Sequence, residues 1–176
     1  DGGQSSNVAG ERGGDASAID ALAGNTSGQL ALSQFVYGGS GGPANAFSFE
    51  GGHGGDGGDA TSVVDNSSTA AFVQSYHQAS GGSGGSGLGD IPTLAGNGGD
   101  ANQTISIENS GGAVYHEAFA EGGYGGFADA SGGDGGHASS ASTVTATNTG
   151  GGIVQVSDIA AGGYGGQTYG SAPIHT

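Results

Sequence analysis

The chain of 176 residues contains no cysteine, methionine, tryptophan or lysine, and Arg12 is its one basic residue. Without cysteine there is no disulfide and no thiol chemistry. One base cannot neutralise a phosphate backbone, which excludes a nucleic acid as partner. No apolar run approaches the roughly 20 residues of a membrane-spanning helix, so the sequence predicts no transmembrane segment.

Bulky apolar residues are also scarce. Leu, Ile, Val and Phe together number 27, against 44 glycines and a formal net charge of −15. Few bulky residues with a high net charge usually indicate disorder. Glycine in a helix costs about 1 kcal/mol per residue, which excludes a helical bundle or a doubly wound α/β enzyme. The remaining alternatives are a disordered acidic chain and a repeat architecture in which glycine has a structural role.

Three sequence markers recur in one order, four times over. Gly-Gly-Asp-Ala begins at residues 13, 57 and 98, and Gly-Gly-His-Ala begins at residue 135, with spacings of 44, 41 and 37. Gly-Gly-x-Gly-Gly begins at residues 38, 81, 122 and 162, with spacings of 43, 41 and 40. An Asn followed by Ser, Thr or Gly lies between them, at residues 25, 66, 109 and 148. The pattern indicates one tandem-repeat domain, 1–176, with a partial unit at 1–12 and units at approximately 13–56, 57–97, 98–134 and 135–176.

Each unit is expected to open with two strands. In residues 101–108, Gln103, Ile105 and Ile107 alternate with Thr104, Ser106 and Glu108, which is typical of a half-buried strand. The Asn-Ser/Thr-Gly cluster that follows is turn chemistry. Second strands are expected at Leu30–Tyr37, Ala71–Gln78, Ala113–Ala120 and Ile153–Ala160. We therefore predict an all-β repeat of four β-hairpin units without α-helix.

The glycine-rich half of each unit has a different period. Residues 51–59 place glycine pairs at every third position, which matches the three residues per turn of polyproline-II geometry. Because the tracts keep their register across the repeats, we expect packed polyglycine-II-like tracts instead of a flexible linker. Variable loops that would fold two tracts back on each other lie at Pro43–Glu50, Ser86–Ala95 and Phe127–Ser131.

The tracts at 38–42, 81–85, 122–126 and 162–166 resemble the polyglycine-II bundles of springtail antifreeze proteins and the glycine-rich adhesin tips of some phage tails. The predicted hairpin halves resemble acidic tandem repeats of bacterial surface adhesins and matrix fibres. The antifreeze bundles use single glycines and often disulfides, whereas this chain has glycine pairs and no cysteine. The resemblance is therefore to a class of glycine-rich extracellular fibre and adhesin proteins.

Aspartates at equivalent repeat positions are candidate metal ligands. Asp15, Asp59 and Asp100 hold one position, and Asp56 and Asp134 lie in the preceding tract. If the units stack, these carboxylates form columns in which like charges repel. Either solvent screens the charges or a hard cation such as Ca²⁺ bridges them. Calcium is the one cofactor that the sequence suggests.

Other motifs give weaker signals. Asn25, Asn66 and Asn102 each begin an N-x-Ser/Thr sequence, the acceptor pattern for N-linked glycans. The five histidines have no metal-ligand spacing, and His53 and His137 are expected to share an exposed position where other units have Asp. Two tracts match G-x-S-x-G, but without the helix that this motif requires, so no catalytic residue is predicted.

The function expected from these features is a non-enzymatic structural subunit of an extracellular filament or surface matrix. Residues 1–12 look like half a unit, and the fourth unit lacks its second tract, so head-to-tail self-assembly would join the two ends. Asp1–Arg12 is expected to contact the C-terminal unit of a neighbour. The alternative is an ice-binding protein, with Thr143, Thr145 and Thr147 ordering water, or a surface adhesin presenting the variable loops.

Overall fold

The computed structural model describes residues 2, 9–46, 52–89, 93–147, 150 and 152–169. Within these ranges the chain forms strands and no helix, which confirms the predicted all-β class; no helix there could cross a membrane. The strands are β1 (Ala16–Ile19), β2 (Gln29–Tyr37), β3 (Ala44–Ala46), β4 (Ala60–Ser68), β5 (Phe72–Ser80), β6 (Gly87–Gly89), β7 (Ala101–Asn109), β8 (Ala113–Glu121), β9 (Ala138–Ala146) and β10 (Val154–Ala161). Asn148, His175 and most of residues 1–8 lie outside the described residues.

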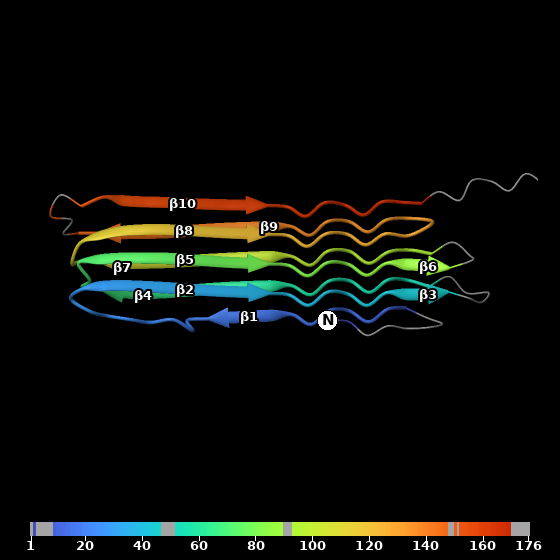
Figure 1. Ribbon diagram of the computed structural model, residues 1–176, viewed down its shortest axis with the longest axis horizontal. Coiled ribbons are helices and arrows are strands. Elements are labelled where there is room, and N and C mark those ends of the chain that lie inside the picture. The colour runs from blue at the N-terminus through green and yellow to red at the C-terminus, as the bar shows by residue number, and fades with distance from the viewer. Residues whose placement is uncertain are drawn as a thin grey trace, which may run out of the picture.

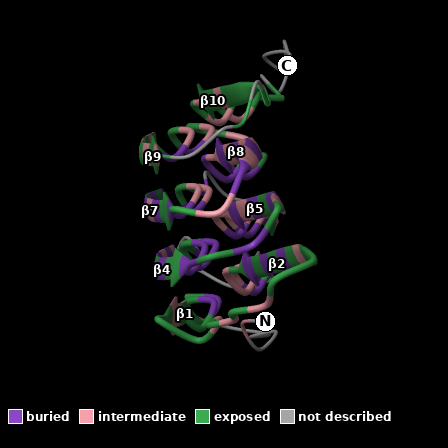
Figure 2. Cartoon of the chain, turned by 90° about the vertical axis from the view of Figure 1, so that its left-hand side faces the viewer, coloured by how far each residue is buried: buried purple, intermediate pink, exposed green. Residues whose placement is uncertain are grey.

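The long strands form two parallel sheets of four strands that lie face to face (Figures 1 and 2). One sheet has the order β1-β4-β7-β9 and the other β2-β5-β8-β10. We call them layer A and layer B, and each layer includes the glycine tracts that continue its strands. The tracts of layer A are 9–15, 52–59, 93–100 and 131–137, and those of layer B are 38–43, 81–86, 122–127 and 162–167. The short strands β3 and β6 pair in parallel beyond the tracts.

Neighbouring strands pair with the spacings of the sequence markers. In layer A, Ala16 lies opposite Ala60, Ala60 opposite Ala101 and Ala101 opposite Ala138, which are offsets of 44, 41 and 37 residues. In layer B the corresponding offsets are 43, 41 and 40. Each unit therefore adds one rung to both layers, and the rungs stack along one axis (Figure 1). The division at particular residues into units stays a prediction.

The predicted β-hairpins are wrong. The two strands of one unit do not pair with each other; β4 pairs with β7 in layer A, whereas β5 pairs with β2 and β8 in layer B. The turn at residues 69–71 carries the chain from one layer to the other. Parallel pairing with the next rung replaces the antiparallel ladder that a hairpin would need. The same short polar turn serves both arrangements, so the turn chemistry could not distinguish them.

The core lies between the layers (Figure 2). Alternate residues of the long strands point inward, and the largest fully buried apolar side chains are Val64, Val73, Ile105, Ile107 and Val114. Toward the tracts the buried residues shrink to alanine, as a second cluster of Val36, Ala60, Ala79, Ala101 and Ala120 shows. Smaller side chains let the layers converge, until glycine backbones of the two layers hydrogen-bond directly.

Hydrogen bonds in the tracts repeat every three residues. The first glycine of a pair donates its N–H to the next rung of its own layer, as Gly81 does to Glu121 O at 2.9 Å. The second glycine donates across to the other layer, as Gly82 does to Gly58 O at 2.8 Å. The third residue lies toward solvent, and its side chain forms part of the outer surface. Backbone pairing thus continues the fold where no large side chains are available.

Candidate functional site

The aspartates of layer A form a hydrogen-bonded column. Asp15 Oδ1 accepts the backbone N–H of Asp59 at 2.9 Å, and Asp59 Oδ1 accepts that of Asp100 at 2.8 Å. Asp100 Oδ1 in turn accepts the N–H of His137 at 2.8 Å. Each carboxylate therefore satisfies the outward N–H of the third tract residue on the next rung. These are the N–H groups that the period-three backbone pairing leaves over.

A second column in layer A makes the same contacts. Asp56 Oδ1 accepts the N–H of Asn97 at 2.7 Å, and Asn97 Oδ1 accepts that of Asp134 at 2.9 Å. An uncharged amide thus replaces a carboxylate here with the same geometry. The acceptor oxygen, more than the negative charge, is what the position requires.

Arg12 closes the first column at its N-terminal end. Its guanidinium lies 2.6 Å from Asp15 Oδ1 and 3.1 Å from Asp59 Oδ2. The backbone N–H of Asp59, together with Arg12, holds the pKa of the Asp15 carboxyl below its usual value. The single base of the chain therefore lies where it offsets repulsion within the column.

The candidate calcium ligands consequently lie in two columns rather than in one cluster. In the described part of the chain, no three or more His, Asp or Glu side chains gather where they could hold a metal ion. Calcium binding by Asp15, Asp59, Asp100, Asp56 and Asp134 stays a prediction. His53 and His137 are both exposed, but they do not share a position: His53 lies opposite Leu94, and His137 follows Asp100 in the first column.

Substitutions at Asp100 should separate an acceptor role from a charge role. Asp100→Ala removes the acceptor of the His137 N–H, and we expect it to lower the free energy of unfolding by about 1 kcal/mol. Asp100→Asn keeps an oxygen there, as Asn97 does, and should leave stability unchanged. Urea denaturation at pH 7 measures both. Equal losses in the two variants would instead indicate a role for the charge, and a fall in melting temperature with excess chelator would then support calcium.

The three candidate glycan acceptors differ in exposure. Asn25 and Asn102 are exposed, although Asn25 Oδ1 already accepts the N–H of Thr69 at 2.9 Å. Asn66 is 3% exposed, and its Oδ1 accepts the N–H of Gly24 at 2.9 Å. Its Nδ2, the atom that would carry a glycan, is buried. The fold therefore leaves no room for a glycan on Asn66, whereas glycosylation of Asn25 and Asn102 stays a prediction.

A chain of polar side chains crosses the core between the layers. His77 and His116 are fully buried, with ring centroids 5.7 Å apart. Ser75 Oγ lies 2.6 Å from His77 Nε2 and 3.2 Å from His116 Nδ1. His116 Nε2 lies 2.7 Å from Ser142 Oγ, which donates to Asp158 Oδ1 at 2.8 Å.

The geometry of these five polar side chains is not that of a nucleophilic triad. In a Ser-His-Asp triad the acid contacts the histidine, whereas here Ser142 lies between Asp158 and His116. Ser75 is fully buried, so a substrate does not reach its hydroxyl. Burial, and then the charge of His116, lowers the pKa of His77 to about 4. Sequence reasoning missed both histidines, although alternation with Val73 and Ala79 places His77 on the inward face.

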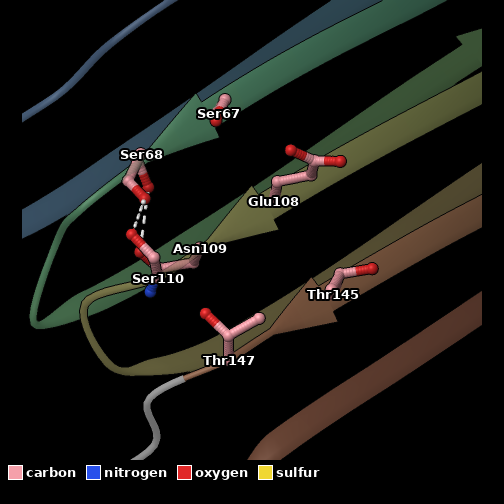
Figure 3. A pocket seen from close by; sticks show the side chains of 7 residues that line it. All are labelled: Ser67, Ser68, Glu108, Asn109, Ser110, Thr145 and Thr147. Atoms are coloured by element: carbon pink, nitrogen blue, oxygen red, sulfur yellow. Dashed lines mark hydrogen bonds between the residues drawn. The ribbon is translucent and has the colours of Figure 1, made fainter.

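A hydroxyl-rich hollow lies at the end of the layer A strands (Figure 3). Its volume is about 210 Å³, and Ser67, Glu108 and Thr145 line it from β4, β7 and β9. Asn109 fixes the turn beside it, since its Oδ1 accepts from Ser68 Oγ at 3.1 Å and its Nδ2 donates to Ala70 O at 3.0 Å. These contacts assign Asn109 a structural role.

The two outer faces of the molecule differ in composition. All Phe and Tyr residues in the described ranges belong to layer B or, in the case of Tyr169, follow its last tract; they are Phe35, Tyr37, Phe72, Tyr76, Tyr115, Phe119, Tyr124, Phe127, Tyr164 and Tyr169. Layer A instead carries the aspartate columns and short polar side chains. Thr143 and Thr145 are exposed there, but Ser106 and Glu108 lie opposite them, so threonine does not repeat from rung to rung.

The last rung leaves core-facing residues uncovered. Val114 of β8 is 1% exposed, whereas Val154, opposite it on β10, is 42% exposed. Val156, opposite the buried His116, is 46% exposed. No further strand covers the outer edge of β10 within the described part of the chain. This edge is therefore both apolar and unpaired.

Comparisons with known proteins give little further guidance. No protein-family model and no curated protein matches the chain. One solved structure shows a likeness: a springtail antifreeze protein from Granisotoma rainieri, described as a bundle of nine polyproline type II helices whose crystal waters match the ice lattice. The sequences are 22% identical over 90% of this chain and 94% of that chain, with a TM-score of 0.28. A TM-score this low carries no argument about fold or function.

Proposed function

We propose that this chain is a non-enzymatic structural subunit that stacks head to tail into an extracellular filament or surface matrix. The single observation that carries the proposal is the presence of glycines at both ends of the stack where the isolated chain has room for a side chain. The acidic, lysine-free composition supports a place outside the cell.

Glycine is required inside the stack by close backbone contact. A Cβ on Gly58, Gly99 or Gly136 would lie 2.0 to 2.2 Å from the carbonyl oxygen of the preceding rung. The equivalent glycine of the first rung is Gly14, and a Cβ there would meet nothing within 4 Å. Among the described residues, the first rung thus has, at Gly14, space against which a preceding rung could pack.

The C-terminal end shows the complementary feature. Cβ atoms on Gly38, Gly81 and Gly122 would lie 1.9 to 2.1 Å from a carbonyl oxygen of the next rung of layer A. On Gly162, the last member of this series, a Cβ would have only Gly136 O of its own rung within 4 Å, at 3.7 Å. In a continued stack the missing neighbour of Gly162 is the Gly14 carbonyl of the next copy.

Stacking would also cover the uncovered apolar edge. We call the contact between two stacked copies the joint. In it, β10 of one copy would lie beside β2 of the next, and the Gly162 N–H would donate to the Tyr37 carbonyl, as the Gly122 N–H does to Ala161 O within the chain. Gly2 already occupies the place beside Ser40 in its own chain, so the joint uses the strand half of the rung and ends near Tyr164. Such a heterologous contact propagates instead of closing.

The sequence predicts that residues 1–12 contact a neighbouring copy, whereas residues 9–12 already pair within their own chain. Residues 9–15 run along 52–59 of the same chain, where Gly10 donates to His53 O at 2.7 Å and Gly13 to Asp56 O at 2.8 Å. Among the described residues, no strand pairs with the outer edge of β1, which continues residues 9–15, so the C-terminal rung of a second copy would pair there. We infer further that the tracts have polyglycine-II-like geometry, which the three-residue period of their hydrogen bonds supports.

Alanine at the two end glycines should block assembly and leave the subunit folded. We expect Gly14→Ala and Gly162→Ala to keep the melting temperature of the wild-type monomer, because each methyl group has space in the isolated chain. Neither variant should form filaments in negative-stain electron microscopy. In a filament the methyl group that Gly14→Ala or Gly162→Ala adds would overlap the backbone of the neighbouring copy, as a Cβ on the equivalent inner glycines would overlap the neighbouring rung.

Gln167→Ala, at an outward-facing tract position, is the matched control and should assemble normally. Fibre diffraction of the wild type should show a reflection near 4.7 Å along the filament axis, the spacing of paired strands. Filaments of wild-type appearance from Gly162→Ala would contradict the joint. Wild-type protein that stays monomeric at high concentration would contradict the function.

Ice binding is the second candidate, and the regular outer face of layer A favours it. Parallel pairing places short polar side chains in a row across the rungs, namely the exposed Ser17, Asn102 and Ser139 and the half-buried Thr61. Such a row has a repeat of about 4.8 Å set by the strand spacing. Inhibition of ice recrystallisation at micromolar protein, by a monomer that forms no filaments, would favour this function over assembly.

A further inference from the structure

We propose that a groove on the outer face of layer B binds a neutral saccharide chain, a function additional to stacking. The groove has a volume of about 390 Å³ and crosses three rungs. Its walls come from Tyr124, Phe127, Tyr164 and Gln167, and Ser83 and Ser86 line the part on the preceding rung. Glycine backbone lies between these walls.

The period of the tracts creates this groove. Outward side chains occur at every third residue, about 9 Å apart along an extended helix with a rise of 3.1 Å per residue. At the two glycines between them, an added Cβ would point into the backbone of a neighbouring tract. On Gly125, for example, it would lie 2.0 Å from Gly133 O. The floor is therefore bare backbone, and it runs along the stacking axis, as a chain-like ligand requires.

Aromatic rings form the walls. The rings of Tyr124 and Tyr164 are stacked, with centroids 5.8 Å apart and an interplanar angle of 3°. Phe127, on the opposite wall, is 44% exposed and packs against Tyr169 at 6.1 Å. The Tyr124 hydroxyl donates to Glu121 at 3.1 Å, which holds the ring in place. Aromatic faces fixed in this way can pack against the apolar C–H faces of sugar rings.

The polar groups of the groove match a polyhydroxylated ligand. Ser83, Ser86 and Gln167 offer hydroxyl and amide groups that both donate and accept hydrogen bonds. An apolar cleft with a few such groups is the usual form of a small-molecule site. None of the side chains that line the groove is charged, although the chain carries a net charge of −15.

The net negative charge of the chain and the uncharged groove distinguish between anionic, cationic and neutral ligands. The overall negative potential disfavours polyanions, including acidic polysaccharides and nucleic acids. A cationic ligand would find its counter-charges in the aspartate columns of layer A and none in this groove. Stacking surfaces, hydrogen-bonding groups and the lack of charge together point to a neutral saccharide.

Calorimetric titration of the full chain with cellohexaose, chitohexaose and maltohexaose tests the proposal. At least one of these neutral probes should bind, and polygalacturonate should not. Tyr124→Ala and Phe127→Ala should each weaken that binding by about tenfold, or about 1.4 kcal/mol. Both side chains are well exposed, so the variants should keep the melting temperature of the wild type.

Phe35→Ala and Tyr76→Ala are the matched controls. These two exposed rings also pack together on layer B, with centroids 5.6 Å apart, but outside the groove. Their loss should leave saccharide affinity unchanged. The proposal is overturned if none of the three hexasaccharides binds, or if the control variants weaken binding as much as Tyr124→Ala does.

Discussion

Gly99→Ala should prevent the chain from folding. A Cβ on Gly99 would lie 2.1 Å from Gly58 O and 2.5 Å from the carbonyl carbon of the same residue. Gly58 O already accepts the N–H of Gly82 at 2.8 Å, and Gly99 itself donates to Gly82 O at 2.8 Å. Backbone therefore fixes the obstructing atom and the substituted residue alike. We expect a loss of more than about 4 kcal/mol, a large share of the stability of an ordinary domain.

The matched control for this substitution is Gly14→Ala. Gly14 holds the same repeat position as Gly99, but a Cβ there has no neighbour within 4 Å. Circular dichroism and urea denaturation of dilute, monomeric protein should show a folded control and an unfolded or strongly destabilised Gly99→Ala. If Gly99→Ala unfolds at the same urea concentration as Gly14→Ala, the close backbone packing described for the tracts is wrong.

The contrast between these two glycines shows what the sequence could and could not predict. The marker spacings of 44, 41 and 37 residues reappear as the register of layer A, because each unit adds one rung. Alternation in 101–108 likewise placed Ile105 and Ile107 in the core. In the sequence, however, Gly14 and Gly99 hold the same repeat position and cannot be told apart. Only the stack shows which of them has a backbone against it.

The hairpin error and the role of the aspartates have a common cause. Whether two successive strands pair with each other or with the next rung depends on contacts between residues about 40 positions apart. The turn after Ser68 is compatible with both. In the same way, the expected repulsion in the column of Asp15 and Asp59 assumed that the carboxylates meet only each other. In the fold Asp15 accepts a backbone N–H that period-three pairing leaves over.

The buried histidines should make the protein sensitive to mild acid. His77 has a pKa lowered from 6.5 to about 4, mainly by burial, so the folded state stays unprotonated where the unfolded chain already binds a proton. The free energy of unfolding must then fall as the pH drops from 6.5 to about 4, and level off below that for this group. The shift corresponds to about 3 kcal/mol. Burial also lowers the pKa of His116, against the opposing charges of Asp158 and Glu117, so it acts in the same direction.

Replacing His77 with glutamine tests this account in the intact chain. Gln34 lies opposite His77 in the neighbouring strand and is also buried, so an amide suits this column of the core. Urea denaturation between pH 7 and 4 at constant salt should show that His77→Gln loses most of the wild-type pH dependence. His137→Gln, at an exposed tract position, is the control and should behave as the wild type. If His77→Gln is as acid-sensitive as the wild type, some group other than the buried imidazole sets the stability in this pH range.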